Sequence, residues 1–316
     1  MQTPLRKIAM NSIFKHILVI ESSSDTNNFV LQRAVDVAKQ NHVKITVFRS
    51  FYKEVHDKKF DSGLPDDLSL FVLQQQQLIC EKFNRLTDED LDLDIIISWQ
   101  APAVTSIAAI INANKISLVM RLFHKENHLL DLFTLSVERY LTRHCELPVW
   151  LVKNNAQLPE YKILACLDID DDTETNKALN HTILDASEQL IPLKSAELHI
   201  LDCYYGESAS IAINYDADSG FREGVSVKRQ HMKTINKYVA AHANINGTVH
   251  LNESMPDDDI PQTADELHVG LTIIGNCKHD HFFNRMLGDS SQFLTDKISS
   301  DILVIKPDSE NMMLAM

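Results

Sequence analysis

Glycine is the residue that this sequence most clearly lacks. The chain has 8 glycines in 316 residues, and the stretch before residue 205 holds only Gly63, against an average usage near 7%. Backbone N–H groups approach a phosphate most closely where glycine removes the side chain. An ordinary glycine-rich phosphate loop is therefore excluded from the first half, and only the second half can carry one.

Cysteines and long apolar runs are scarce as well. The five cysteines are odd in number and form no Cys-x-x-Cys pair, so we expect free thiols rather than a disulfide framework. No apolar run reaches bilayer length, and the N-terminal stretch has no secretory apolar region. The sequence thus predicts a cytoplasmic protein without a membrane span. The five cysteines are Cys80, Cys145, Cys166, Cys203 and Cys277.

Basic residues are outnumbered by acidic ones. Lysine and arginine total 30 against 44 aspartates and glutamates, which gives a formal net charge of −14. Affinity for nucleic acid depends on neutralising phosphates with basic side chains, so the balance argues against nucleic acid and anionic membrane partners. The acidity is instead typical of a protein that stays in solution.

Short apolar strands alternate with helical stretches, and the second half repeats the order of the first. This alternation predicts parallel βαβ units covered on both faces. We therefore predict two tandem α/β domains, 1–155 and 156–316, each with a five-stranded parallel sheet and joined by the polar stretch 154–160. The predicted strands are 15–21, 44–51, 94–98, 117–120 and 149–153, then 162–168, 196–203, 249–252, 271–274 and 302–306. The predicted helices are 27–40, 68–87, 135–144, 178–190 and 222–243.

The last strand of each half is apolar on both faces. Such a strand at a sheet edge promotes aggregation unless it is covered or paired. We expect 149–153 to pair with 302–306, which would make the two domains a pseudo-two-fold dimer within one chain. The alternative is that both are interior strands of their own sheets.

The candidate phosphate site begins where the strand 271–274 ends. Gly275 follows the strand, and Gly288 precedes a helix start at Asp289, Ser290 and Ser291. This is the layout of a loop that places phosphates on a helix N-terminus. Lys278 and Asp289, however, stand where such a loop would have glycine or a hydroxyl.

Asp289 weighs against a phosphate in that loop. An aspartate at a helix start caps the same N–H groups that a phosphate would use. Its charge at ~4 Å and an effective dielectric of ~20 costs about 4 kcal/mol, of which Lys278 recovers part. Two interpretations stay open: a nucleotide site, or a loop retained for packing.

Asp168 is the second candidate ligand residue. It follows the strand 162–168, and the carboxyl ends of parallel strands face the crevice where ligands bind in open α/β sheets. Because Asp170, Asp171 and Asp172 follow it, the alternative is a solvated acidic turn.

The segment 203–226 forms a long insertion between a strand and a helix. Loops of this length are uncommon unless they are functional, and its apolar side chains could line a cavity for an amphiphilic ligand. The alternative is that it packs back over its own sheet. The candidate lining residues are Tyr204, Tyr205, Ile211, Ile213 and Phe221.

Metal and nucleophile chemistry have weak candidates. Cys277, His279, Asp280 and His281 have metal-competent side chains, but their spacing is too tight to converge on one ion. A Cys–His nucleophile would need a third, orienting group that the sequence does not place. We predict no metal site and no catalytic residue, and the other histidines show no specific pattern.

The order of strands and helices, together with the closing segment GNCKHDHFFNRMLGDSSQFLTDKISSDILVIKP, resembles the universal stress protein family in its tandem, two-domain type. The resemblance covers nearly all of 14–307 and is stronger in the second half. It implies a pair of flavodoxin-like or Rossmann-like domains that act in stress response.

The resemblance also assigns positions to the candidate site. Nucleotide-binding members carry Gly-x-x-Gly, nine residues, then Gly-Ser or Gly-Thr, and an aspartate after the first strand. Gly275 and Gly288 match the first and third glycines, whereas Lys278 replaces the second. Asp289 replaces the hydroxyl residue. Asp168 occupies the aspartate position in the second half, and Glu21 occupies it in the first.

These observations predict a non-enzymatic stress-response protein that senses a ligand or protects the cell, with any small-molecule site in the second domain. One alternative is an ATP-binding or ATP-hydrolysing protein that uses the loop from Gly275 to Ser291. Another is a binder of an amphiphilic or lipid-like ligand that uses 203–226. ATP is the only cofactor candidate, weakened by Lys278 and Asp289, and further homo-oligomerisation is left open.

Overall fold

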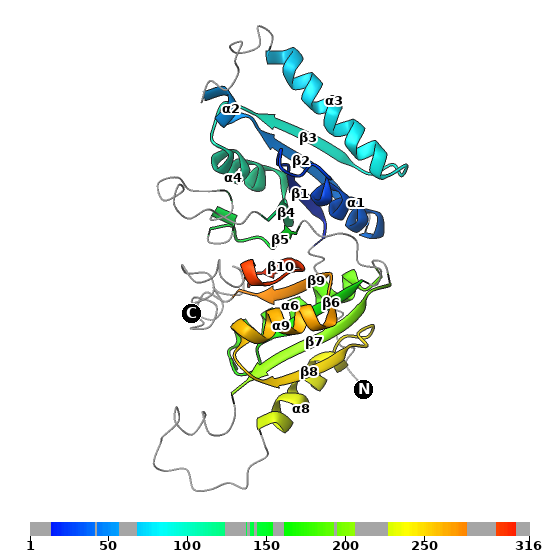
Figure 1. Ribbon diagram of the computed structural model, residues 1–316, viewed down its shortest axis with the longest axis vertical. Coiled ribbons are helices and arrows are strands. Elements are labelled where there is room, and N and C mark those ends of the chain that lie inside the picture. The colour runs from blue at the N-terminus through cyan, green and yellow to red at the C-terminus, as the bar shows by residue number, and fades with distance from the viewer. Residues whose placement is uncertain are drawn as a thin grey trace, which may run out of the picture.

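The chain folds around one continuous ten-stranded sheet in the order β3-β2-β1-β4-β5-β10-β9-β6-β7-β8. Figure 1 shows the two halves stacked along the long axis, with β5 and β10 at their junction. The computed structural model describes residues 14–41, 43–56, 68–123, 137, 140–141, 144–153, 161–192, 195–205, 227–276 and 295–307.

The first half supplies five parallel strands and the helices that cover them. The strands are β1 (His16–Ile20), β2 (Lys44–Ser50), β3 (Leu93–Ser98), β4 (Leu118–Leu122) and β5 (Val149–Val152). The helices given for this half are α1 (Phe29–Asn41), α2 (Tyr52–His56), α3 (Leu68–Leu86) and α4 (Ala103–Asn114).

The second half repeats this arrangement with its own five parallel strands. They are β6 (Lys162–Leu167), β7 (Glu197–Tyr204), β8 (Thr248–Glu253), β9 (Leu271–Gly275) and β10 (Asp301–Ile305). The helices that the structure describes in this half are α6 (Glu174–Leu190), α8 (Val227–Ala240) and α9 (Pro256–Leu267).

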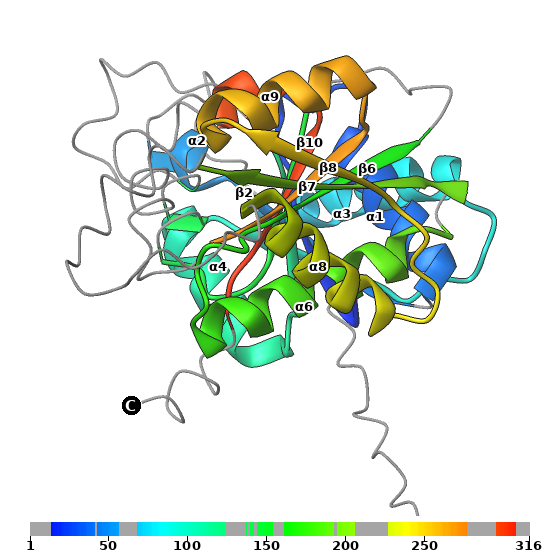
Figure 2. The same ribbon diagram turned by 90° about the horizontal axis from the view of Figure 1, so that it is seen from below.

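Two apolar cores lie on opposite faces of the sheet. Figure 2 shows α9 on one side of the strands and α6 with α8 on the other. One core runs across both halves beneath α1, α3, α6 and α8, and the other packs α4 and α9 against the opposite face. Alternating strand side chains feed the two cores, as expected for sheets buried on both sides.

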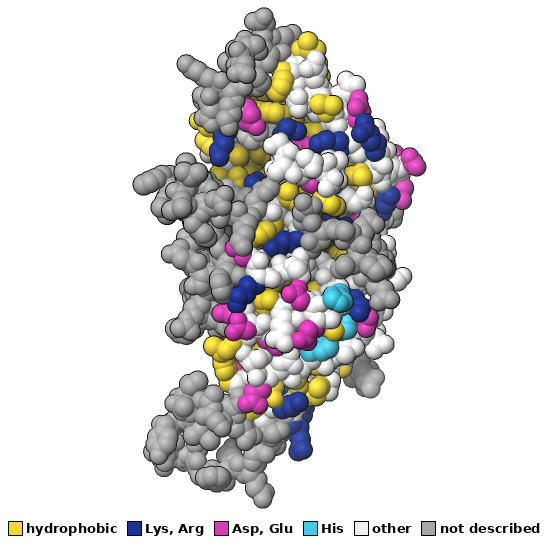
Figure 3. All heavy atoms as spheres, in the orientation of Figure 1, with side chains coloured by type: hydrophobic (Ala, Val, Ile, Leu, Met, Phe, Trp, Pro, Cys, Tyr) yellow, Lys and Arg dark blue, Asp and Glu magenta, His cyan; other side chains and the backbone are white. Residues whose placement is uncertain are grey.

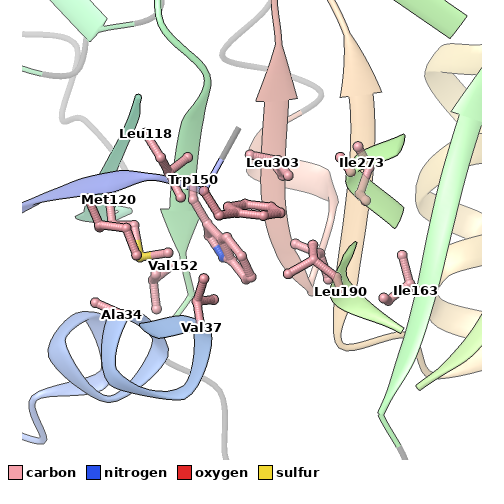
Figure 4. Close-up of a cluster of buried hydrophobic side chains, with 14 of the residues drawn as sticks. Ala34, Val37, Leu118, Met120, Trp150, Val152, Ile163, Leu190, Ile273 and Leu303 are labelled. Atoms are coloured by element: carbon pink, nitrogen blue, oxygen red, sulfur yellow. The ribbon is translucent and has the colours of Figure 1, made fainter. Parts of the chain in front are cut away.

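The seam between the halves is an antiparallel pairing of β5 with β10. Trp150 lies opposite Leu303, and Leu151 lies opposite Ile302. Trp150 is fully buried; Figure 4 shows it between Val37 of α1 and Leu190 of α6, beside Leu303. The two halves therefore form the intramolecular pseudo-dimer that the sequence predicts.

The structure confirms all ten predicted strands to within two residues at each end. Helix α6 starts at Glu174 rather than 178, because Thr173 caps it by accepting a hydrogen bond from the N–H of Asn176. Helices α2, α4 and α9 had no predicted range, and α9 contains Pro261. The domain boundary at 154–160 and part of the predicted helix 135–144 lie outside the described residues.

Among the described residues, no helix combines the length and apolar composition that a bilayer crossing requires.

Candidate functional site

The predicted site residues divide into those that the structure describes and those that it does not. Asp168 follows β6, Gly275 ends β9, and Tyr204 ends β7 with Tyr205 next to it. Tyr204 is buried, whereas Tyr205 is 39% exposed. Lys278, Gly288, Asp289, Ser290, Ser291, Ile211, Ile213 and Phe221 lie outside the described residues, as do Cys277, His279, Asp280 and His281.

Asp168 is held in a tightly bonded turn. Its Oδ1 accepts hydrogen bonds from the N–H groups of Asp170 and Asp171 at 3.1 and 3.3 Å. Its carbonyl accepts the side-chain amides of Asn176 and Asn180 at 2.8 and 2.7 Å. Both asparagines are buried on α6. These bonds are those expected for an acidic turn, and they hold Asp168 in place at the carboxyl end of β6.

Gly275 has a packing role in this structure. A Cβ added there would lie 2.7 Å from Cδ2 of Leu179 and 3.2 Å from Cδ1 of Ile183, both on α6. The missing side chain is what lets α6 lie close to β9. This role requires no ligand, and it is compatible with either interpretation of the loop that follows.

The sequence reading missed a buried histidine between two carboxylates at the same edge. Nδ1 of His231, on α8, lies 2.7 Å from Oδ2 of Asp202 on β7. Its Nε2 lies 3.2 Å from Oδ1 of Asp170 in the β6–α6 turn. His231 is 5% exposed and Asp202 is 1% exposed. The available signal was Asp202, an acid inside an apolar strand, because a buried carboxylate requires a partner.

The two carboxylates set the charge of this site. Hydrogen bonds to Asp170 and Asp202 raise the pKa of His231 to about 9, so the imidazolium form dominates at neutral pH. Burial raises the pKa of Asp202, and the hydrogen bond with His231 opposes that rise. Among the described residues, Asp168, Asp170, Asp171 and Asp202 lie at this edge, and the nearby Lys177 pairs with Asp172 and Glu174. Figure 3 shows histidine and acidic side chains close together on one face of the second half, but on the side where β7 begins rather than at the edge where it ends, so they are not part of this site.

His231 should make the stability of the chain depend on pH. Its folded-state pKa of about 9 exceeds the ordinary value of 6.5, so the stabilisation is fully present below 6.5 and is lost as the pH rises through about 9. The free energy of unfolding, measured by urea denaturation across this range, should therefore fall. His231→Gln should flatten that part of the curve.

The control for this measurement is His242→Gln, because Asp185 also raises the pKa of His242. It should leave the decline due to His231 in place. A His231→Gln curve that runs parallel to the wild-type curve would contradict the assignment.

The corresponding edge of the first half is closed by ion pairs. Glu21 follows β1 and accepts from Arg49 of β2 at 3.0 Å and from Lys82 of α3 at 2.5 Å. Asp25 caps α1 by accepting the N–H groups of Phe29 and Val30. The hollow lined by Glu21 and Asp25 holds only ≈ 10 Å³, about one water molecule. Little space is left there for a ligand.

Three of the described thiols are poorly suited to nucleophilic chemistry. Burial raises the pKa of Cys145, Cys166 and Cys203, whereas a reactive cysteine needs a lowered pKa. Cys203 instead donates to Asp259 at 3.2 Å. Within the described part of the chain, no group of three or more His, Cys, Asp or Glu side chains is arranged so that it could hold a metal ion.

Known proteins resemble the chain over nearly its whole length. Universal stress protein E of Photorhabdus laumondii is 22% identical over 308 residues, which covers 93% of this chain and 96% of that protein. A universal stress protein from Archaeoglobus fulgidus matches in structure with a TM-score of 0.62 at 13% identity, over 94% and 98% of the two chains. A protein of unknown function from Pseudomonas aeruginosa PAO1 matches with a TM-score of 0.67 at 19% identity, over 95% of each chain.

The match to the family pattern lies in the first half. Residues 13–153 match the universal stress protein family, although the motifs that suggested the resemblance were clearer in the second half. The first half has therefore kept the family's overall pattern without a glycine loop. The first half of the chain thus matches the universal stress protein family, and the whole chain is similar to universal stress proteins over nearly its full length.

Proposed function

We propose that this stress-response protein senses a small molecule without turning it over, through a site at the carboxyl edge of the second sheet. The observation that carries the proposal is the buried pair of His231 and Asp202. The second ring nitrogen of His231, Nε2, contacts Asp170. The site would comprise these three residues with Asp168 and Tyr204.

The location supports a ligand role. The strand order reverses between β9 and β6, and open α/β sheets bind ligands at the carboxyl ends of strands beside such a switch point. Buried ionisable groups with strongly shifted pKa values gather at functional sites. Asp170 is 47% exposed at its side chain, so a ligand can reach the outer contact of His231. In the first half, the equivalent carboxylate is Glu21, which forms ion pairs with Arg49 and Lys82.

The chemistry supports binding rather than turnover. Both ring nitrogens of His231 have carboxylate partners, which leaves neither for proton transfer with a substrate. The carboxylates that the described part of this edge carries would repel a triphosphate, so an uncharged or positively charged ligand fits them better. A ligand that displaces Asp170 from His231 would shift the protein between two states by its difference in affinity for them.

Native mass spectrometry of freshly purified full-length protein tests this proposal. We expect a co-purifying small molecule that is reduced in His231→Gln and retained in Glu21→Gln, the matched control at the closed edge of the first half. If the molecule is retained in His231→Gln and lost in Glu21→Gln, the binding site lies in the first half and the proposal is wrong.

Thermal denaturation with added ATP separates the two alternatives. Stabilisation by ATP that is abolished by Gly288→Val would favour the nucleotide loop from Gly275 to Ser291. Phosphate release that also depends on Asp168 would favour hydrolysis. A co-purifying lipid would favour the amphiphile site of 203–226, for which exposed Tyr205 offers one aromatic contact.

A further inference from the structure

The seam between the halves contains contacts of two kinds. Some are repeated by the pseudo-two-fold symmetry, and others exist on one side only. The pairing of β5 and β10 is itself symmetric, because Trp150 and Leu303 hold equivalent places in the two strands and lie opposite each other. Backbone pairing alone would therefore accept two like halves as readily as two unlike halves.

Two buried lysines form the symmetric contacts. Lys153, after β5, donates from Nζ to the carbonyl of Thr295 in the second half at 2.5 Å. Lys306, after β10, donates from Nζ to the carbonyls of Leu141 and Cys145 in the first half. Each half thus reaches the segment that precedes the last strand of the other. Because both halves carry the lysine, these contacts do not distinguish one half from the other.

Arg33 and Asp301 form a contact that exists on one side of the seam. Asp301, in β10, accepts from Nε of Arg33 in α1 at 2.9 Å and from Nε1 of Trp150 at 3.3 Å. Its Oδ1 accepts the N–H of Lys153 at 2.8 Å. Asp301 is 1% exposed and Arg33 is 6% exposed. The carboxylate is thus buried and is held by three groups of the first half.

Neither half can supply both members of this pair. Pro148 stands before β5 where Asp301 stands at the start of β10, so the first half offers no carboxylate at that place. Helix α6 of the second half carries no lysine or arginine after Lys177 in its first turn, so the second half offers no counterpart of Arg33. A seam of two second halves would bury two unpaired carboxylates, and a seam of two first halves would bury two unpaired guanidinium groups.

We infer that the pair of Arg33 and Asp301 makes the seam selective, so that the β5 edge accepts the β10 edge and rejects a second copy of itself. Specificity often comes from an unpaired buried charge in the wrong complex rather than from extra attraction in the right one. Fixing the register or the choice of partner is also the best-attested use of a buried polar or ionic contact. The surface at the seam therefore fits the opposite half of this chain and excludes like halves of neighbouring copies.

Refolding of the full chain tests partner choice. Arg33→Gln with Asp301→Asn removes both charges and keeps an acceptor for Trp150 and Lys153. After unfolding in urea and refolding at increasing protein concentration, this double variant should give a rising fraction of higher mass by light scattering. The wild-type chain should return to its starting mass at every concentration. An apolar pair, Arg33→Met with Asp301→Leu, should behave like the first double variant.

The matched control removes the symmetric contacts. Lys153→Met with Lys306→Met should lower the thermal midpoint and still return to the wild-type mass. Wild-type mass at every concentration for both charge-free variants would overturn the inference. Equal oligomerisation of the lysine variant would overturn it as well, because lost stability alone would then explain the result.

Discussion

Replacing Arg33 with methionine should lower the free energy of unfolding by about 3–5 kcal/mol, the usual cost of leaving one member of a buried ion pair without its partner. Asp301 would stay 1% exposed while losing the guanidinium that lies 2.9 Å away. Burial already raises the pKa of Asp301, and Arg33 opposes that rise, so the variant should also shift this carboxyl toward its protonated form. Urea denaturation followed by tryptophan fluorescence measures the loss, because Trp150 lies at the seam.

The second substitution separates a lost pair from lost packing. Adding Asp301→Asn to Arg33→Met should recover most of the stability, since no buried charge is then left without its partner and the asparagine oxygen can still accept from Trp150 and Lys153. Lys177→Met is the surface control, because its partners Asp172 and Glu174 are largely exposed and such pairs contribute little. A double variant no more stable than Arg33→Met alone would show that the guanidinium acts through packing.

Gly275→Val should destabilise the chain by about 1–3 kcal/mol, the range for inserting atoms into a filled core. The new Cβ would lie 2.7 Å from Cδ2 of Leu179, and the two valine methyl groups would crowd the same space. Helix α6 must then move away from β9, and it carries Asn176 and Asn180, which hold the turn of Asp168. Thermal denaturation measures the loss.

A compensating substitution checks the physical cause. Leu179→Ala should relieve the contact, so Gly275→Val with Leu179→Ala should be less destabilised than the sum of the two single changes. Additive losses would contradict the steric explanation. Any effect of Gly275→Val on ligand binding would have to be interpreted against this movement of α6.

The fold could be predicted because its signals are local and repeated. A run such as Lys162–Leu167 is short, apolar and followed by an acidic turn, and the second half repeats the order of the first, so each strand prediction supports another. Helix starts were harder. The stretch before α6 is acidic and polar, and only the hydrogen bond that the Thr173 side chain accepts from the N–H of Asn176 shows that the helix has begun. Helix α9 has a proline in its interior, which favours a turn in a sequence reading.

The location of the candidate site could be predicted, but the side chains that form it could not. Asp168 was located by its position after β6, but its bonds to α6 depend on side chains 8 and 12 residues away. His231 lies 29 residues beyond Asp202, and only the pairing of β6 with β7 and the packing of α8 bring it to Asp170. Gly275 was interpreted as part of a phosphate loop because glycine serves both close ligand approach and close helix packing, and the sequence cannot separate these uses.

Because the two halves are covalently linked, the sheet does not come apart when the protein is diluted. An assembly of two separate chains dissociates as its concentration falls, whereas β5 here finds β10 on the same polypeptide. Each molecule therefore keeps its complete sheet at any protein concentration, however low.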